Sequence, residues 1–200
     1  MDTQRLVESR LNKTFIMGDE HWNHNAVFIY EPRGFQAPED MWCACINNWK
    51  AVHTVRGEDP ESLYIHLGDS IMGTQDLLPR VARQFSSYGT HLFCRGNHMS
   101  DKKRHQLEDE YGWIYIGEEF TFRYRGREIV LSHYPLDIAR VNSHRSEKPE
   151  DGRMPMINIH AHTHSRNFHT APYQICVSAD ALDCVPFNLK DAIKAALQNI

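Results

Sequence analysis

Five short groups of polar residues contain the side-chain types that most often bind metal ions or transfer protons. They are Asp19-Glu20-His21, Gly68-Asp69, Gly96-Asn97-His98, His133 and His160-Ala161-His162-Thr163-His164. Their possible ligand atoms belong to imidazoles, carboxylates and one amide, without a thiolate. This set suits Mn, Fe, Zn or Ni at a hydrolytic site and argues against an all-cysteine structural zinc site.

The spacing within two of these groups places pairs of ligands on one side of the chain. Residues two apart in an extended segment point in the same direction, so Asp19 and His21 can hold one ion, and so can His162 and His164. Each group alone occurs often by chance, whereas all five in this order predict a metal centre.

Glycines precede two of the expected ligands. Gly68 comes before Asp69, and Gly96 comes before Asn97. Because glycine lets the backbone turn sharply, we expect both ligands to come close to the metal ions.

Each polar group follows or ends a segment that reads as a strand. The predicted strands are Thr14–Gly18, Ser62–Gly68, Thr90–Gly96, the hairpin Phe120–Tyr124 and Arg127–Ser132, Met156–His160 and Tyr173–Ser178. The predicted helices are Pro38–His53, Asp76–Tyr88, Asp101–Tyr111 and Leu189–Leu197, and Ala139–Pro155 is a predicted loop. Strands and helices alternate in the first half, which favours parallel strands. We therefore expect an α/β fold in which two mixed β-sheets pack face to face, flanked by helices, with the ligands beyond the carboxyl ends of the strands.

The size and charge of the chain limit what it can be. Its 200 residues fit one domain spanning 1–200, and its net charge of -4 gives no basic field for nucleic acid or an anionic membrane. The five cysteines form no CxxC pair and are expected to be small, mostly buried residues. The segment 1–13 has no apolar core and no apolar run reaches membrane-spanning length, so we predict a cytoplasmic protein without a signal peptide.

The ordered set of motifs from Phe15 to His164 resembles the calcineurin-like metallophosphoesterase superfamily. It is most similar to the small single-domain phosphoesterases of bacteria and their phages, whose first motif often has a second histidine, here His24. The segments Leu131–Leu136 and Asn158–Ser165 also resemble that subgroup. The resemblance implies a bacterial or phage-infected cytoplasm and two divalent metal ions, with Mn²⁺ expected.

The resemblance also implies a role for each motif residue. Asp19, His21 and His164 would bind the first ion, Asn97, His133 and His162 the second, and Asp69 would bridge both. A hydroxide held between the ions would attack phosphorus in line, and the ions would stabilise the attacking and leaving oxygens. His98 would bind a phosphate oxygen or protonate the leaving group.

Four more residues are candidates for contacts with the substrate. His24 lies close to the first motif, Arg95 ends the third strand, and His144 and Arg145 lie in the predicted loop. Packing is the competing interpretation for His24. His160 exceeds the ligand count, so it is expected to support other ligands or the fold.

The chain departs from the superfamily pattern at three places. Met99 follows the GNH group where an acid is common, and Ser70-Ile71-Met72 follows Asp69 where a second acid is common. Because such an acid can orient the catalytic histidine, the group that orients His98 is left open. Ala161 replaces the usual glycine of the last motif, which is a mild change unless the backbone there needs a positive φ.

The leading hypothesis is a hydrolase of small or nucleotide-like phosphodiesters. A phosphomonoesterase or a nuclease with the same site is the alternative among enzymes, although the negative charge disfavours tight binding of duplex nucleic acid. A binuclear amide hydrolase would have its HxH pair on the first strand, whereas here that pair comes last. A metal-bound binding module without turnover is the alternative from another class, which the complete ligand set and His98 disfavour and the missing acids favour.

Overall fold

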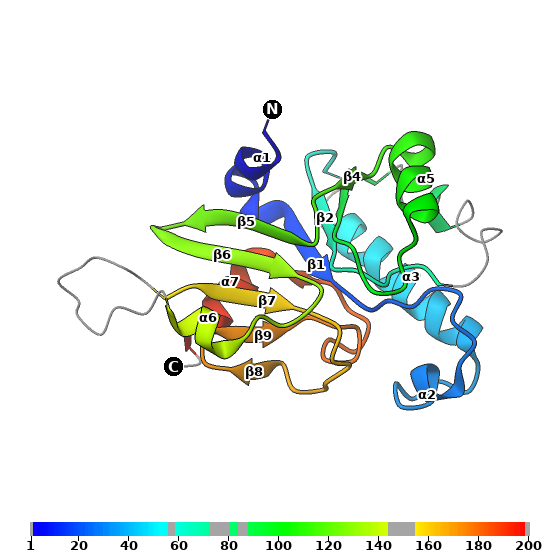
Figure 1. Cartoon of the computed structure of the whole chain (residues 1–200). Helices are drawn as coiled ribbons and strands as arrows, with labels where there is room; N and C mark the ends of the chain where they lie inside the picture. Colours follow the sequence, from blue (N-terminus) through cyan, green and yellow to red (C-terminus); the bar gives the residue numbers. More distant parts are fainter. Residues whose placement is uncertain (1, 56–58, 73–80, 84–87, 144–154, 199–200) are drawn as a thin grey trace.

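The computed structural model describes residues 2–55, 59–72, 81–83, 88–143 and 155–198 (Figure 1). Its helices are α1 Thr3–Ser9, α2 Val27–Tyr30, α3 Pro38–Val55, α5 Asp101–Tyr111, α6 Ile138–Ser143 and α7 Leu189–Gln198. Its strands are β1 Thr14–Met17, β2 Leu63–His66, β3 Thr90–Phe93, β4 Ile114–Tyr115, β5 Glu119–Tyr124, β6 Arg127–Ser132, β7 Ile157–His160, β8 His169–Ala171, β9 Gln174–Cys176 and β10 Phe187–Asn188. Most of the predicted helix Asp76–Tyr88 lies outside the described residues.

The strands form two mixed sheets of five strands each. The order in the first sheet is β10-β1-β2-β3-β4, in which β1 to β4 run parallel and β10 is antiparallel. The order in the second sheet is β5-β6-β7-β9-β8, with a parallel centre of β6, β7 and β9 and an antiparallel strand at each edge. The predicted fold class, two mixed sheets with helices outside, is confirmed.

Alternating side chains assign the faces of each sheet. In β1, Ile16 points into the core between the sheets, while Phe15 and Met17 point to the layer of α3 and α5. In β6, Leu131 points into the same inter-sheet core, whereas Val130 packs in a smaller cluster with Val141 of α6. Figure 1 shows α3 and α5 beside the first sheet and α6 beside the second. The sheets therefore share one core, and their strand ends meet at its edge.

The hairpin β5–β6 has the predicted two-residue turn. Arg125 and Gly126 have φ values of 51° and 81°. A turn with positive φ at both central residues matches the twist of the paired strands, and Arg-Gly supplies the glycine that the second position favours. This turn sets the register that ends β6 next to His133.

The predicted loop Ala139–Pro155 is wrong at its beginning, where α6 forms. The Ala139 N–H donates to Oδ1 of Asp137 at 2.7 Å, and Val141 is buried against Val130 and Met156. One short polar turn with a single buried face leaves no readable helical period in the sequence. In the described part of the chain, no helix is both long and apolar enough to cross a membrane.

Candidate metal centre

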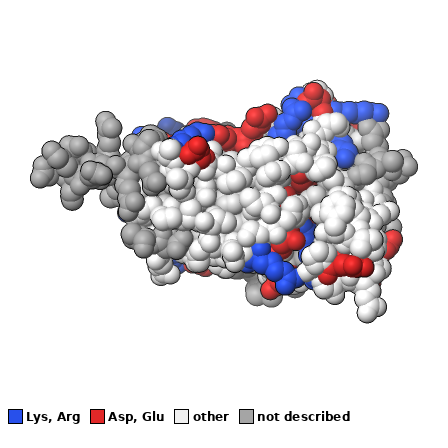
Figure 2. Space-filling model, turned by 60° about the horizontal axis from the view of Figure 1, so that its bottom comes forward, with Lys and Arg blue, Asp and Glu red and all other residues white. Residues whose placement is uncertain are grey.

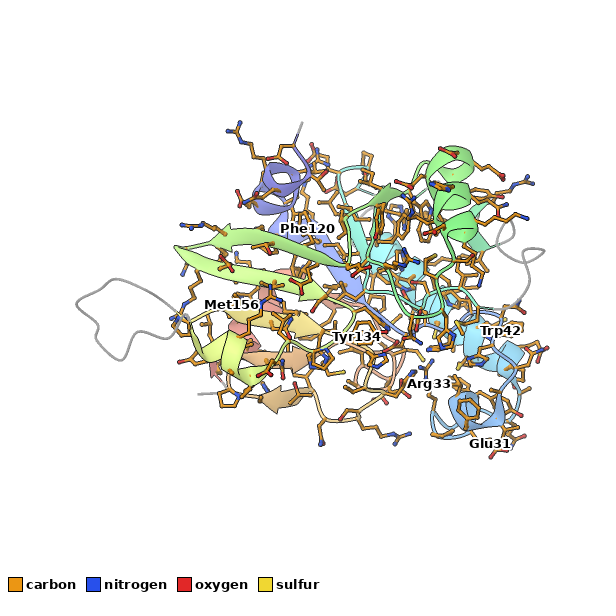
Figure 3. All side chains as sticks on the ribbon, viewed as in Figure 1. Glu31, Arg33, Trp42, Phe120, Tyr134 and Met156 are labelled. Atoms are coloured by element: carbon orange, nitrogen blue, oxygen red, sulfur yellow. The ribbon has the colours of Figure 1, made fainter. Side chains whose placement is uncertain are left out.

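The seven expected ligands come together where the strands of the two sheets end. The motifs follow β1, β2 and β3 of the first sheet and β6 and β7 of the second. Four of the seven are buried, namely Asp19, His21, Asp69 and His133, whereas Asn97 is exposed. The site therefore lies where the two sheets meet, and Figure 3 labels two residues that contact it, Arg33 and Tyr134.

Asp19, His21 and His164 form a first ligand group. Oδ1 of Asp19 lies 3.8 Å from Nε2 of His21 and 4.0 Å from Nε2 of His164. Two ligands of one ion at about 2.2 Å can be at most about 4.4 Å apart, so these atoms can share an ion. Asp19 Oδ1 and His21 Nε2 are buried and have no hydrogen-bond partner. Because a buried unpaired oxygen and nitrogen are costly, a cation between them fits what the structure shows.

Four atoms form a second group around His133. Its Nε2 lies 2.9 Å from Oδ1 of Asn97, 3.2 Å from Nδ1 of His162 and 3.3 Å from Oδ2 of Asp69. The other ring nitrogen of His133 lies 2.8 Å from the carbonyl oxygen of Leu67, to which it can donate. That bond turns Nε2 toward the site, as is usual for a histidine ligand.

Asp19 belongs to both sets of possible ligand residues in this structure. Its side chain is grouped once with His21 and His164 and once with Asp69 and His133. Oδ2 of Asp19 also accepts a 2.7 Å hydrogen bond from the backbone of His162. The bridging role of Asp69 therefore stays a prediction, and Asp19 is a second candidate for it.

Five of the ligands have left-handed backbone. The φ values are 54° at Asp19, 53° at His21, 50° at Asp69, 66° at His162 and 50° at His164. The expected extended DxH and HxH segments are therefore wrong in detail, because alternate residues turn back rather than continue a strand. Such conformations cost about 1–3 kcal/mol each and persist only where the surroundings impose them.

Two glycines make room for expected ligands, Gly96 for Asp69 and Gly68 for His133. A Cβ on Gly96 would lie 2.1 Å from Oδ1 of Asp69 and 2.5 Å from its backbone nitrogen. A Cβ on Gly68 would lie 2.5 Å from Nδ1 of His133, and Gly68 also has a φ of 82°. The expected sharp turn is thus present at Gly68, whereas Gly96 is needed for the close approach of Asp69 rather than for its conformation.

Arg33 and Asp180 support the first group and were not predicted from the sequence. Nδ1 of His164 lies 2.8 Å from Oδ2 of Asp180. Arg33 donates two hydrogen bonds to that carboxylate, of 3.0 and 2.7 Å, and a 2.8 Å bond to the carbonyl oxygen of Asp19. The side chains of Arg33 and Asp180 are 3% and 9% exposed. One arginine thus connects the backbone of one expected ligand to the side chain of another.

The pKa values in this network follow its hydrogen bonds. Burial opposes ionisation of Asp180, but its bonds to His164 and Arg33 lower its pKa to about 2. Burial also opposes charging of His164, yet the bond to Asp180 raises the pKa of that imidazole. Asp180 is therefore an anion that holds Nδ1–H of His164 and leaves Nε2 facing Asp19.

The predicted catalytic residue, His98, lines a cleft beside the first group. The cleft has a volume of about 450 Å³. Its walls are formed by His21, His24, Phe28, Ile29, Pro32, His98, His164 and Asp180. The ring centre of His98 lies 6.0 Å from that of His21, and its backbone N–H donates to Oδ1 of Asp69 at 2.9 Å. His98 is thus adjacent to the ligands while its ring faces the open side.

His24 lies against His21 and on the wall of the cleft. Its Nδ1 lies 2.9 Å from Nδ1 of His21, and its ring also lines the cleft. Burial, followed by the neighbouring His21 and His98, lowers the pKa of His24 to about 4. A neutral His24 can accept the Nδ1–H of His21, which leaves Nε2 of His21 for an ion.

Arg95, another candidate for substrate contact, is not brought to the cleft. Arg95 donates to Oδ1 of Asp101 at 3.1 Å and is not among the residues that line the cleft. His144 and Arg145 lie outside the described residues. His160 is buried, with its ring nitrogens near Ala161 and Thr170, which fits the structural role expected for it.

Glu20, between two ligands, faces away from them into the first sheet. Its Oε1 lies 2.6 Å from Nδ1 of His66, whose Nε2 lies 3.1 Å from Nδ1 of His91. Burial raises the pKa of Glu20 to about 8 and lowers that of His66 to about 3. The two groups are therefore neutral together near pH 7, which makes them tolerable in the core. Glu20 fixes the motif to the sheet.

These features define a class of protein, an α/β sandwich with a candidate two-metal centre at the junction of its sheets. The fold implied by the motif resemblance, two packed mixed sheets, is the fold observed. The chain matches no known family profile.

Particular relatives extend over nearly the whole chain. The uncharacterized protein MJ1445 of Methanocaldococcus jannaschii is 28% identical over 193 residues, which cover 92% of this chain and 91% of the relative. The solved structure of AQ665 from Aquifex aeolicus, a protein of unknown function, matches with a TM-score of 0.64 at 20% identity, over 91% of this chain and 98% of that one. Pseudomonas putida nuclease MPE matches with a TM-score of 0.48 at 15% identity, over 78% and 63% of the two chains. The likeness to AQ665 shows a shared fold.

Proposed function

We propose that this protein is a metal-dependent phosphoesterase that hydrolyses small or nucleotide-like phosphodiesters. The observation that carries the proposal is the pair of buried, unpartnered atoms Asp19 Oδ1 and His21 Nε2, facing Nε2 of His164. A second group of nitrogen and oxygen atoms around His133 fits a second ion. The side chains suit Mn²⁺, with Fe, Zn or Ni as alternatives.

Two such ions would supply Lewis acidity at phosphorus and would lower the pKa of a bound water molecule to near 7. The residues of the chain would perform the remaining work. Asp180 and His24 hold the rings of His164 and His21 in place, and Asp69 holds the backbone N–H of His98. His98, on the cleft wall, would bind a phosphate oxygen or give a proton to the leaving oxygen.

The charge of the cleft favours diesters over monoesters. Among the described residues, none of those lining the cleft is a lysine or arginine. Arg33, buried beneath it, is already bound to Asp180. Because a monoester carries a second negative charge that would go without a protein cation, the singly charged diester is the better substrate.

The test combines metal content with substrate preference. The purified protein, reloaded with Mn²⁺, is expected to contain close to two ions per chain by elemental analysis. It is expected to release p-nitrophenolate faster from bis-(p-nitrophenyl) phosphate than from p-nitrophenyl phosphate, and only with metal.

Three results would change the assignment. A metal content of one or none would contradict the two-metal centre. A clear preference for the monoester would make the protein a phosphatase. Bound metal without turnover of any phosphoester, including single-stranded nucleic acid, would indicate a binding module.

A further inference from the structure

One wall of the cleft is apolar and comes from α2 and the turn after it. Phe28, Ile29 and Pro32 line this wall, in the same cleft as His21 and His164. The Phe28 side chain is 74% exposed, the most exposed of the large apolar side chains in the described residues. A single exposed apolar residue is ordinary on a protein surface, but this one stands at the mouth of the candidate active site.

A series of rings leads from the first ligand group to Phe28. The ring centres of His21 and His24 are 5.0 Å apart and stacked, and those of His24 and Phe28 are 6.0 Å apart and perpendicular. The Phe28 ring therefore lies two ring contacts from an expected ligand, on the wall of the same cleft. Its face is open to stack on a planar group.

The wall is fixed at its far end. Arg33 binds Asp180 and the carbonyl oxygen of Asp19, and Arg166 donates a hydrogen bond to the carbonyl oxygen of Pro32. The turn after α2 is thus held to the metal side of the cleft by the same arginine that supports His164. A wall held in place before binding loses less entropy when a ligand packs on it.

The positive charge near the cleft belongs to Arg33 and Arg166, which are bound to Asp180 and to the carbonyl oxygen of Pro32. Figure 2 shows the face that includes the lower edge of Figure 1, and its described residues form no continuous band of lysine and arginine. The cleft lining also lacks these residues. Beyond the metal ions and His98, affinity for a nucleotide-like ester can therefore come from packing on the ring.

We infer that Phe28 is the stacking site for the nucleobase of a nucleotide-like phosphodiester whose phosphorus lies at the metal centre. The inference rests on the proposed phosphodiesterase function and adds a substrate class to it. Tyr134 lies beside the second group, with its ring centre 4.3 Å from that of His162. It would contact the other ester substituent.

The test uses three esters with one leaving group. Methyl, hexyl and thymidine 5′ p-nitrophenyl phosphates all release p-nitrophenolate, so their chemical steps match. Wild-type protein with Mn²⁺ is expected to prefer the thymidine ester. Phe28→Ala is expected to lower kcat/KM for that ester about 5- to 100-fold, mainly through KM, and to leave the methyl ester within about twofold.

Matched variants separate a ring from an apolar surface. Phe28→Tyr keeps the ring and is expected to behave like wild type, whereas Phe28→Leu is expected to behave like Phe28→Ala. Val185→Ala, which removes another exposed apolar side chain outside the cleft lining, is expected to change nothing.

Several outcomes overturn the inference. Equal losses on all three esters would mean that Phe28 holds the common nitrophenyl group or shapes the metal site. A loss on the hexyl ester as large as on the thymidine ester would show an apolar site rather than a base site. Absence of metal-dependent turnover of every ester by the wild type would instead contradict the proposed function itself.

Discussion

At the scale of single residues, three of the expected histidine ligands are each paired with a group that orients the imidazole ring. His164 is oriented by Asp180, His21 by His24, and His133 by the carbonyl of Leu67. For the ring of His98, the structure gives no hydrogen bond within the described residues. The two acids that are common in the resembling proteins are replaced here by Met99 and by Ser70-Ile71-Met72, which agrees with that finding.

The first prediction separates metal binding from proton transfer. His98→Ala is expected to retain metal and to lower kcat about 10²–10⁴-fold, because the leaving oxygen loses its proton donor. The loss should be smaller for an ester that releases p-nitrophenolate, which leaves without a proton, than for a nucleotide diester. Metal content and kcat on both esters are the measurements.

Asp69→Asn is the comparison for that experiment, with metal and activity expected to fall together. Loss of both ions would support a bridge by Asp69, and loss of one would favour Asp19 as the bridge. If His98→Ala removes a metal ion, then His98 is a ligand. If it changes neither metal content nor rate, the missing acids have deprived it of a role.

The second prediction concerns the support of His164. Asp180→Asn removes the charge that holds Nδ1–H while keeping the size of the side chain, so Mn²⁺ affinity is expected to fall about 10- to 100-fold. Calorimetric titration of the chelator-treated protein measures this change. Glu119→Gln is the matched control, since it alters the exposed two-bond pair with Arg140. Equal affinity in the wild type and Asp180→Asn would contradict the supporting role.

At the scale of elements, long patterned segments could be predicted and short ones could not. The helices α3 and α5, the hairpin and the central strands were expected within a few residues. The two-residue strands β4 and β10, and the one-turn helix α2, are too short to show a period, and their positions depend on contacts far away in sequence.

The rule that found the ligands would also have found one of the residues that was missed. Asp180 follows the predicted strand Tyr173–Ser178, at its carboxyl end, in the same position as the ligands after the other strands. Arg33, which lies in a turn after α2, had no such signal in the sequence. Its contact with the carbonyl oxygen of Asp19 is visible only in the structure. The left-handed φ values at the aspartate and histidine ligands could not be predicted either, because such values are expected at glycine rather than at these residue types.

The third prediction tests the close approach of two strand ends. Gly96→Ala would place a Cβ against the side chain and backbone nitrogen of Asp69, so Asp69 must move. Metal affinity and activity are expected to fall strongly, whereas the free energy of unfolding is expected to change less. Gly126→Ala is the control, because its Cβ meets nothing within 4 Å, although its positive φ should cost about 1 kcal/mol of stability. Wild-type metal affinity in Gly96→Ala would show that the close approach of Gly96 to Asp69 is not needed.

At the scale of the whole molecule, the candidate metal centre lies between two sheets that otherwise touch through apolar side chains. Asp19, His21, Asp69 and Asn97 come from the first sheet, and the remaining three ligands from the second. Metal ions bound there would favour the packed arrangement over any state in which the sheets separate.

The fourth prediction follows from that linkage. Mn²⁺ at about a hundred times its Kd is expected to add about 2.7 kcal/mol of stability per site, which raises Tm by several degrees in a chain of this size. Differential scanning calorimetry with and without chelator measures the shift. Asp69→Asn is expected to lose much of the increase, and Glu119→Gln to keep it. A Tm that does not respond to Mn²⁺ would contradict a centre that joins the sheets.

The position of β1 determines when the first sheet can be completed during synthesis of the chain. β1 lies between β2 and β10, with Phe15 opposite Asn188, and Gly18 is bridged to Ser178. Phe15 leaves the ribosome about 170 residues before its antiparallel neighbour Asn188, roughly 10 to 30 s at ordinary rates of translation. His164, the third member of the first ligand group, follows His21 by 143 residues, so that group can form only late in synthesis, after β7 has been made.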